Sequence, residues 1–256
     1  MIEQRRIIRG DSWGLCLQQV LARAATDTAS WMQRETQLLK SDANSLVGLL
    51  SLQDQCCYLK LYRYKSHVQK MLFRMGRGRA VRNFDIACKL ATNGVPVPRP
   101  LACLQVPEGL LLLTEAIAGG SDLADLWQQQ PAGAEAGKLL QGAGAAIARL
   151  HRAGYAHGDC KWNNLLCARD QFYLVDLDGA HKASAGSARQ ARDVARFTLN
   201  AEELAIGLPR YEMFLASYLQ GVDEPRTDVI AGMLPILHTL RARHLTKYGE
   251  RGQPLF

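Results

Sequence analysis

Two short stretches of this 256-residue chain decide how the rest of it is interpreted. His157–Asn164 read H-G-D-C-K-W-N-N, and Val175–Gly179 read V-D-L-D-G. An alanine-rich helical segment, Gly137–Ala153, precedes the first stretch, and β-type runs at Leu165–Ala168 and Phe172–Asp176 follow it. The order helix, polar loop, β hairpin and acidic turn predicts one polar site made by the two stretches.

The first stretch resembles the catalytic loop of kinases, H-x-D-x-x-x-x-N, and the second stands where kinases have D-F-G. Phosphoryl transfer needs a carboxylate to accept the attacking hydroxyl, which we assign to Asp159. It needs an amide oxygen and a carboxylate to hold Mg²⁺, for which we choose Asn164 and Asp176. Lys161 supplies a cation for the transferred group. Taken alone, the match also fits a core histidine and a turn aspartate.

The β-type runs and helices are segregated along the chain. Five runs of strand length come first: Glu35–Lys40, Ser45–Gln53, Cys56–Tyr62, Leu101–Gln105 and Gly109–Ala116. A helix is expected at Ala80–Thr92 and another at residues 12–24, whereas the chain after Gly120 is mainly helical. The pattern predicts an α+β, protein-kinase-like, two-lobed fold. Residues 1–116 would form a small antiparallel β lobe and residues 117–256 a helical lobe.

Three residues outside these stretches form the predicted nucleotide-binding set. Lys60 lies between apolar neighbours in the third β-type run, where a kinase needs a lysine for the α- and β-phosphates. A lysine facing solvent on a strand is the plainer alternative. Glu115 and Ile117 complete the set at the junction between the lobes.

The chain departs from the kinase pattern at two places. The turn Ser41–Asn44 is not glycine-rich, and Gly48 is the only glycine of its hairpin, so we expect a shorter phosphate lid. Asn83 stands where a helical glutamate would pair with the lysine, and Asp85 with Lys89 is expected to form an ordinary surface pair. Asp178 occupies the usual glycine position and is a secondary candidate beside Asp176.

The composition is that of a globular protein with a basic surface. Hydrophobic residues make up 48% and charged residues 21%, and the formal charge is +7, which favours an anionic partner. The seven cysteines form no C-x-x-C pair, which predicts reduced thiols. Gln18 and Gln19 interrupt the first apolar stretch, so we interpret it as an amphipathic helix rather than a signal peptide, and no apolar run is long enough to span a bilayer.

Taken together, the motifs resemble the bacterial lipopolysaccharide kinase family, which phosphorylates inner-core heptose or Kdo sugars. The shared patterns are A-x-R-N-aromatic at Ala80–Phe84, L-x-x-x-G-V-P-x-P at Leu90–Pro98, the two stretches above, and R-D-x-A-R at Arg192–Arg196. The heptose kinase branch is the nearest in pattern. The resemblance implies ATP and Mg²⁺ as cofactors, a lipid-linked core oligosaccharide as acceptor, and a peripheral position on the cytoplasmic face of the inner membrane, without nucleic acid.

Two basic segments could serve such an acceptor. The first runs from Arg63 to Arg82 and contains Leu72, Phe73 and Met75, a mixture suited to an acidic core and anionic headgroups. The second is near the C-terminus and comprises Arg241, Arg243, His244, Lys247 and Arg251. A solvated charged surface is the alternative for both.

Asp193 is predicted to brace the backbone of the catalytic loop. Only a short segment joins Asp176 to Arg192, which favours a small or lipid-linked acceptor over a protein. Four other functions remain open from the sequence. They are an aminoglycoside-type kinase, a small kinase of tRNA modification, a nucleotide-binding pseudokinase scaffold and a nucleic-acid binder.

Overall fold

The structure is a computed structural model that describes residues 5–24 and 26–256. The chain forms two compact units. Unit 1 comprises Met1–Lys89 with Pro98–Ala118, and unit 2 comprises Leu90–Val97 with Gly119–Phe256. Unit 1 carries an antiparallel sheet and unit 2 is mainly helical, so the α+β class predicted from the sequence is confirmed.

The core of unit 1 is a six-stranded antiparallel sheet with the order β1-β5-β6-β4-β3-β2. Its strands are β1 (Arg6–Arg9), β2 (Gln37–Ser41), β3 (Ser45–Leu52), β4 (Gln55–Arg63), β5 (Pro100–Val106) and β6 (Gly109–Glu115). Five of the six correspond to the predicted β-type runs. β2 begins two residues later than predicted, because Glu35 is the last residue of helix α2 (Thr28–Glu35).

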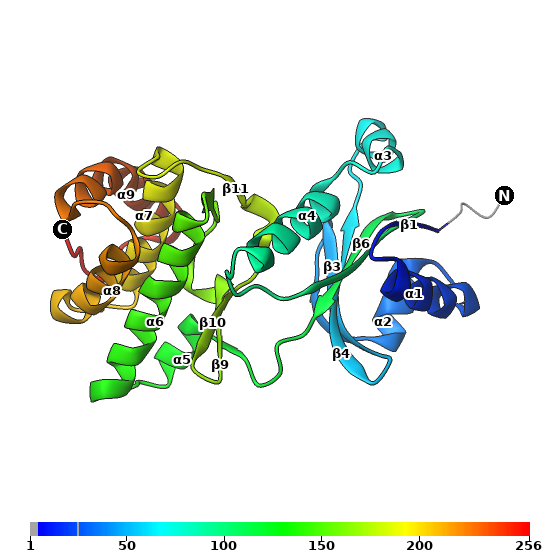
Figure 1. Cartoon of the computed structure of the whole chain (residues 1–256), viewed down its shortest axis with the longest axis horizontal. Coiled ribbons are helices and arrows are strands. Elements are labelled where there is room, and N and C mark those ends of the chain that lie inside the picture. The colour runs from blue at the N-terminus through cyan, green and yellow to red at the C-terminus, as the bar shows by residue number, and fades with distance from the viewer. Residues whose placement is uncertain (1–4, 25) are drawn as a thin grey trace. The chain divides into compact units, whose positions relative to one another are not determined.

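Helices cover both faces of this sheet (Figure 1). The apolar faces of α1 (Asp11–Arg23) and α2 pack on one face, where Leu59 and Leu61 of β4 are fully buried. α3 (His67–Arg74) and α4 (Arg79–Thr92) pack on the other, through residues such as Phe73. Because side chains alternate along a strand, Lys60 lies on the face that α3 and α4 cover.

The sequence did not predict β1, α2 or α3. β1 has only four residues, two of them arginines, and it pairs with β5, so only the tertiary fold identifies it as a strand. Asp85 accepts hydrogen bonds from Arg9 of β1, with the Nε donor at 2.9 Å, and its predicted surface pair with Lys89 stays a prediction. The ion pair with Arg9 fastens the edge strand to α4.

Unit 2 is built from two pairs of packed helices. α6 (Gly133–Arg152) packs on α8 (Leu208–Gly221), and α7 (Ala188–Glu203) packs on α9 (Arg226–Tyr248). Short strands join them: β7 (Ser121–Asp122), β8 (Tyr155–Ala156), β9 (Leu165–Ala168), β10 (Gln171–Leu174) and β11 (His181–Lys182). α5 (Leu123–Gln128) is preceded by Asp122, whose side chain caps the helix by accepting from the backbone nitrogen of Asp125.

An aromatic cluster forms the centre of unit 2. Trp162 is fully buried between Trp127 and Phe197, with ring centroids 5.5 and 5.1 Å away, and Phe197 stacks on Phe214 at 3.8 Å. Trp162 belongs to the first polar stretch, so the catalytic-loop candidate is anchored in the core.

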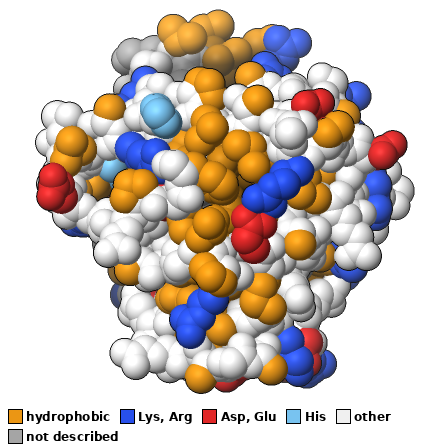
Figure 2. All heavy atoms as spheres, turned by 90° about the vertical axis from the view of Figure 1, so that its left-hand side faces the viewer, with side chains coloured by type: hydrophobic (Ala, Val, Ile, Leu, Met, Phe, Trp, Pro, Cys, Tyr) orange, Lys and Arg blue, Asp and Glu red, His pale blue; other side chains and the backbone are white. Residues whose placement is uncertain are grey.

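The outer surface of unit 2 around α8 and α9 is mixed in character. Figure 2 shows hydrophobic side chains gathered over the middle of this face, with charged side chains scattered around them. Exposed apolar side chains are ordinary on protein surfaces. Within residues 5–24 and 26–256, no helix is both long enough and apolar enough to cross a bilayer.

Gly48 of β3 provides a test of how unit 1 is packed. A Cβ at this position would lie 2.2 Å from Thr36 Oγ1 and 2.8 Å from Thr36 Cβ. Gly48→Ala should therefore lower the free energy of unfolding by about 1–3 kcal/mol, the usual cost of overpacking. Urea unfolding followed by circular dichroism measures this loss.

A double-mutant cycle separates packing from other causes. Thr36→Gly removes both crowding atoms, so adding it to Gly48→Ala should recover much of the lost stability. Gly232→Ala in α9 is the matched control, because its Cβ would lie 3.6 Å from the nearest side chain, and it should not destabilise the chain. Strictly additive effects of the two substitutions would disprove the packing explanation.

Candidate active site

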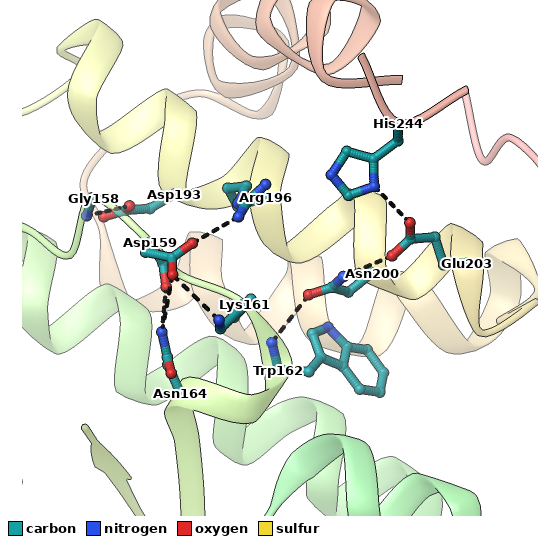
Figure 3. A network of polar contacts seen from close by, with 10 residues as sticks. All are labelled: Gly158, Asp159, Lys161, Trp162, Asn164, Asp193, Arg196, Asn200, Glu203 and His244. Carbon is teal, nitrogen blue, oxygen red and sulfur yellow. Dashed lines mark hydrogen bonds and ion pairs between the residues drawn. The ribbon is translucent and has the colours of Figure 1, made fainter. Parts of the chain in front are cut away.

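The buried carboxylate of Asp193 on α7 fixes the start of the first polar stretch. It accepts hydrogen bonds from the backbone nitrogens of His157, at 2.5 Å, and Gly158, at 2.8 Å. Figure 3 shows the bond from Gly158. His151 Nε2 lies 3.2 Å from the same carboxylate. The predicted role of Asp193 as a brace for this loop is confirmed.

The two polar stretches lie against each other. Gly158 has φ +81°, and a Cβ there would come within 2.5 Å of the carbonyl oxygen of Gly179, so a side chain would separate the stretches. The imidazole Nε2 of His157 donates to the carbonyl oxygen of Val175 at 3.0 Å. The histidine and glycine of H-G-D thus hold the acidic turn in place. The side chain of the aspartate, Asp159, remains as the candidate for chemistry.

Asp159 receives three partners from its surroundings (Figure 3). Arg196 Nη2 is 2.7 Å from Oδ1, Lys161 Nζ is 3.5 Å from Oδ2, and Asn164 Nδ2 donates to the Asp159 carbonyl oxygen at 2.8 Å. Burial acts to raise the pKa of Asp159. The hydrogen bond from Arg196 and the charges of Lys161 and Arg196 outweigh it, so the pKa is lowered and the carboxylate is ionised at neutral pH.

Asn164 and Asp176 are neighbours through the backbone. Val175, which precedes Asp176, donates its N–H to the Asn164 carbonyl oxygen at 3.0 Å. The Asn164 amide nitrogen is used on Asp159, which leaves its amide oxygen as the acceptor. Asp176 is exposed and has φ +58°, a left-handed conformation that aspartate tolerates better than most residues.

This donor set fits Mg²⁺. Magnesium prefers oxygen ligands and is commonly bound by one or two carboxylates together with substrate phosphates and water. Across the described part of the chain, no cluster of three or more His, Cys, Asp or Glu side chains could hold a metal ion by itself. A site of two protein ligands completed by phosphates is therefore the arrangement that Asn164 and Asp176 could provide.

The predicted nucleotide-binding residues belong to unit 1. The half-buried Lys60 has its Nζ 4.8 Å from the centroid of the Tyr62 ring. Glu115 accepts from the backbone nitrogen of Arg99 at 2.9 Å, and Ile117 follows β6 in a half-buried position. The binding role of all three stays a prediction.

The turn between β2 and β3 is closed by its own side chain. Asp42 Oδ1 accepts from the backbone nitrogens of Asn44 and Ser45, both at 2.8 Å. These bonds, together with that from Lys40, lower the pKa of Asp42 to about 2. The two N–H groups therefore donate to Asp42 within the turn, whereas a glycine-rich loop would direct such groups at phosphates.

Two further residues of α7, Arg196 and Asn200, also hold the loop that contains Asp159. The sequence pattern had included Arg196 without a role for it, and it had not included Asn200. Asn200 Oδ1 accepts from the Trp162 backbone nitrogen at 3.2 Å. Both residues follow Asp193 on α7, at spacings of three and seven residues, which place them on the same helical face. That spacing was visible in the sequence once Asp193 had been chosen as a brace.

A basic pocket of about 390 Å³ opens beside Asp159 within unit 2. Its charged lining comes from the loop, from α7 and from α9: Asp159, Arg192, Arg196, Arg243, His244 and Lys247. Arg243, His244 and Lys247 are recognisable in the sequence as part of one basic segment. Nothing in the sequence indicates that they lie beside Asp159.

Comparison with known proteins points to one family. Residues 29–218 match the lipopolysaccharide kinase (Kdo/WaaP) family. A 3-deoxy-D-manno-octulosonic acid kinase of Vibrio vulnificus is 29% identical over 151 residues, which cover 57% of this chain and 63% of that protein. The kinase of the same name from Xanthomonas campestris pv. campestris is 37% identical over 108 residues, 40% of this chain and 42% of its own length. The match thus spans less than two thirds of these relatives.

Removing Arg196 should raise the pKa of Asp159. In Arg196→Gln the hydrogen bond and the positive charge that favour the carboxylate are lost, while the burial that favours the neutral acid remains. Asp159 should therefore protonate at a higher pH than in the wild type. Carbon-detected NMR titration of aspartate-labelled protein, with Asp159→Asn to assign the resonance, measures this shift.

Arg192→Gln is the matched control for this titration. Arg192 lies one helical turn before Arg196 on α7 and forms no hydrogen bond with Asp159 among the described residues. Its removal should shift the titration far less. Equal shifts in the two variants would mean that general charge, not the specific bond, sets the ionisation of Asp159.

Proposed function

This chain belongs to the lipopolysaccharide kinase (Kdo/WaaP) family, as its motifs predicted, and we propose that it transfers the γ-phosphate of ATP to a sugar hydroxyl of the lipopolysaccharide inner core. The observation that carries this proposal is the position of Asp159. It is an ionised carboxylate held by Arg196, next to Lys161 and Asn164, on a loop that is bonded to the turn containing Asp176.

In the proposed reaction, Asp159 accepts the hydrogen bond of the acceptor hydroxyl and orients its oxygen toward the γ-phosphorus. The new oxygen–phosphorus bond forms as the bond between the γ-phosphorus and its bridging oxygen breaks, and ADP leaves. The hydroxyl proton passes to Asp159. A carboxylate with a lowered pKa is a weak base, so its main contribution is orientation, with proton transfer late in the reaction.

The remaining residues of the loop have supporting roles in this proposal. Lys161 offsets charge on the transferred phosphoryl group. Asn164 and Asp176 would hold Mg²⁺, which when bound neutralises phosphate charge. Lys60, Glu115 and Ile117 of unit 1 are proposed to bind the nucleotide.

Two inner-core sugars are candidates for the acceptor. The sequence motifs favoured heptose, whereas the relatives named above are kinases of 3-deoxy-D-manno-octulosonic acid, or Kdo. We propose Kdo as the first acceptor to test, because these named relatives support it, and heptose as the second.

The direct test is phosphate transfer. Purified protein is incubated with magnesium-ATP and lipopolysaccharide that lacks core phosphate, and mass spectrometry of the released core locates the added group. We expect one phosphate on an inner-core sugar. Asp159→Asn should reduce turnover roughly 100-fold or more while nucleotide binding persists, and Asp176→Asn should lose the magnesium-dependent part of nucleotide affinity.

Asp170→Asn is the control for both substitutions. Asp170 is an exposed residue of the β9–β10 turn in the same unit, so the same chemical change there should leave turnover unaffected. No transfer to either sugar by a protein that binds ATP would refute the proposal. It would leave a pseudokinase, or a kinase of another acceptor.

α3 is proposed to place the enzyme on an anionic membrane surface. Val68, Met71, Leu72 and Met75 are 40–68% exposed, and their spacing of three, four and seven residues puts them on one helical face. Phe73 points the other way and is buried against the sheet. Exposed basic residues flank the helix, including Lys65, Arg77 and Arg79. An apolar face bordered by positive charge is suited to the headgroup region of an anionic bilayer.

Co-sedimentation with vesicles tests this membrane proposal. The triple variant Met71→Gln, Leu72→Gln, Met75→Gln should bind mixed phosphatidylglycerol and phosphatidylethanolamine vesicles at least roughly tenfold more weakly than the wild type. Leu208→Gln, an exposed leucine of α8, is the control and should bind normally. Binding that is equal in the triple variant, or equal on neutral phosphatidylcholine vesicles, would exclude this role of α3.

A further inference from the structure

The pocket beside Asp159 carries a large excess of positive charge. Arg192 and Arg196 are four residues apart on α7, and Arg243 and Lys247 are four residues apart on α9, so each pair occupies one helical face. The two pairs line the same cavity of about 390 Å³, a size typical of small-molecule sites. Asp159 is the one carboxylate among the residues that line it.

Three of these cations have no acidic partner among residues 5–24 and 26–256. Arg196 is bonded to Asp159, and His244 to Glu203 at 2.7 Å. Within the described residues, by contrast, no carboxylate forms an ion pair with Arg192, Arg243 or Lys247. Lys247 instead lies over the ring of Tyr248, with its Nζ 4.8 Å from the ring centroid, and its proximity lowers the pKa of Tyr248. The positive potential of the pocket is thus not cancelled internally, and an anionic ligand would gain from it.

A chain of polar contacts ties the pocket wall to the catalytic loop (Figure 3). His244 of α9 bonds to Glu203, Asn200 donates to the other oxygen of Glu203 at 2.9 Å, and Asn200 accepts from the backbone of Trp162. Because α9, α7 and the loop are linked in this way, the fold fixes the distance between Asp159 and the cationic wall formed by Arg243 and Lys247 of α9. A ligand held by that wall would have a fixed relation to Asp159.

We propose that this pocket is the acceptor subsite and that it binds a carboxylate or phosphate of the acceptor sugar. This inference rests on the proposed function, and it adds which chemical group of the acceptor sugar the enzyme recognises. The planar guanidinium of Arg243 suits two-point binding of either anion, and Lys247 adds a point charge. Held there, the sugar presents a hydroxyl to Asp159. An acid sugar such as Kdo supplies the carboxylate, and a neighbouring phosphorylated sugar would supply the phosphate.

The test uses the double variant Arg243→Gln, Lys247→Gln in the full chain. The acceptor KM should rise roughly tenfold to a hundredfold, as expected for lost bonds to an anion. The KM for ATP should stay within about twofold, a change that is small in free energy, and kcat should change little. The control is Lys138→Gln, Arg152→Gln, two exposed cations of α6 that do not line the pocket. It should match the wild type in all three constants.

Modified acceptors identify the anion. If the pocket reads a carboxylate, reducing that group to an alcohol should raise KM for the wild type and have little further effect on the double variant. If it reads a phosphate, an enzymatically dephosphorylated acceptor should give this pattern instead. An unchanged acceptor KM in the double variant, or a rise in the KM for ATP alone, would overturn the proposal.

A binding measurement separates failure of this inference from failure of the proposed function. Calorimetric titration of the protein with free Kdo, with its carboxyl-reduced form and with inorganic phosphate requires no turnover. Binding of one anion that is lost in the double variant and kept in the control would support the subsite even if no phosphate transfer is found. If the acceptor is phosphorylated but neither the KM nor anion binding responds to the double variant, the function stands and the subsite is refuted.

Discussion

The burial of one carboxylate organises the site. Asp193 is fully removed from solvent, and a buried charge is tolerable only when its hydrogen bonds are satisfied. Its partners are the N–H groups of His157 and Gly158 and the ring of His151. Each bond to a charged acceptor contributes about 1.5–3 kcal/mol, so the loop and the carboxylate stabilise each other. The start of the catalytic loop cannot shift without exposing that charge.

α7 extends this arrangement along the loop. Its side chains at positions 193, 196 and 200 face one way, and they bond in order to residues 157 and 158, to Asp159 and to Trp162. The order of contacts along the helix follows the order along the loop. One face of α7 thus positions the backbone of the loop, favours the ionised form of Asp159 and holds the aromatic anchor Trp162. α9 adds Arg243 and Lys247 to the pocket beside Asp159.

The sequence was most informative where local spacing carries the structure. Asn164 lies five residues after Asp159, and the strands after it return the chain to Asp176, so a motif within twenty residues predicts the centre of the site. Arg196 is 37 residues from Asp159, and only the packing of α7 brings it there. β1 and the exposed face of α3 also depend on tertiary contacts. For the same reason the sequence grouped basic residues by their clustering along the chain, whereas the pocket also depends on the packing of α7 beside α9.

The two departures from the kinase pattern that concern nucleotide binding both lie in unit 1. Asp42 accepts hydrogen bonds from two N–H groups of the β2–β3 turn, and Asn83 stands where a glutamate was expected. The proposed binding of phosphates in unit 1 would therefore rely less on backbone donors and on a lysine–glutamate pair. The groups proposed to act on the acceptor hydroxyl all belong to unit 2. A nucleotide-binding scaffold would need the features of unit 1 and would have no use for an arginine that keeps Asp159 ionised. Because the alterations concern the predicted nucleotide-binding groups and the groups around Asp159 are retained, a kinase with fewer contacts to the nucleotide is favoured over a pseudokinase.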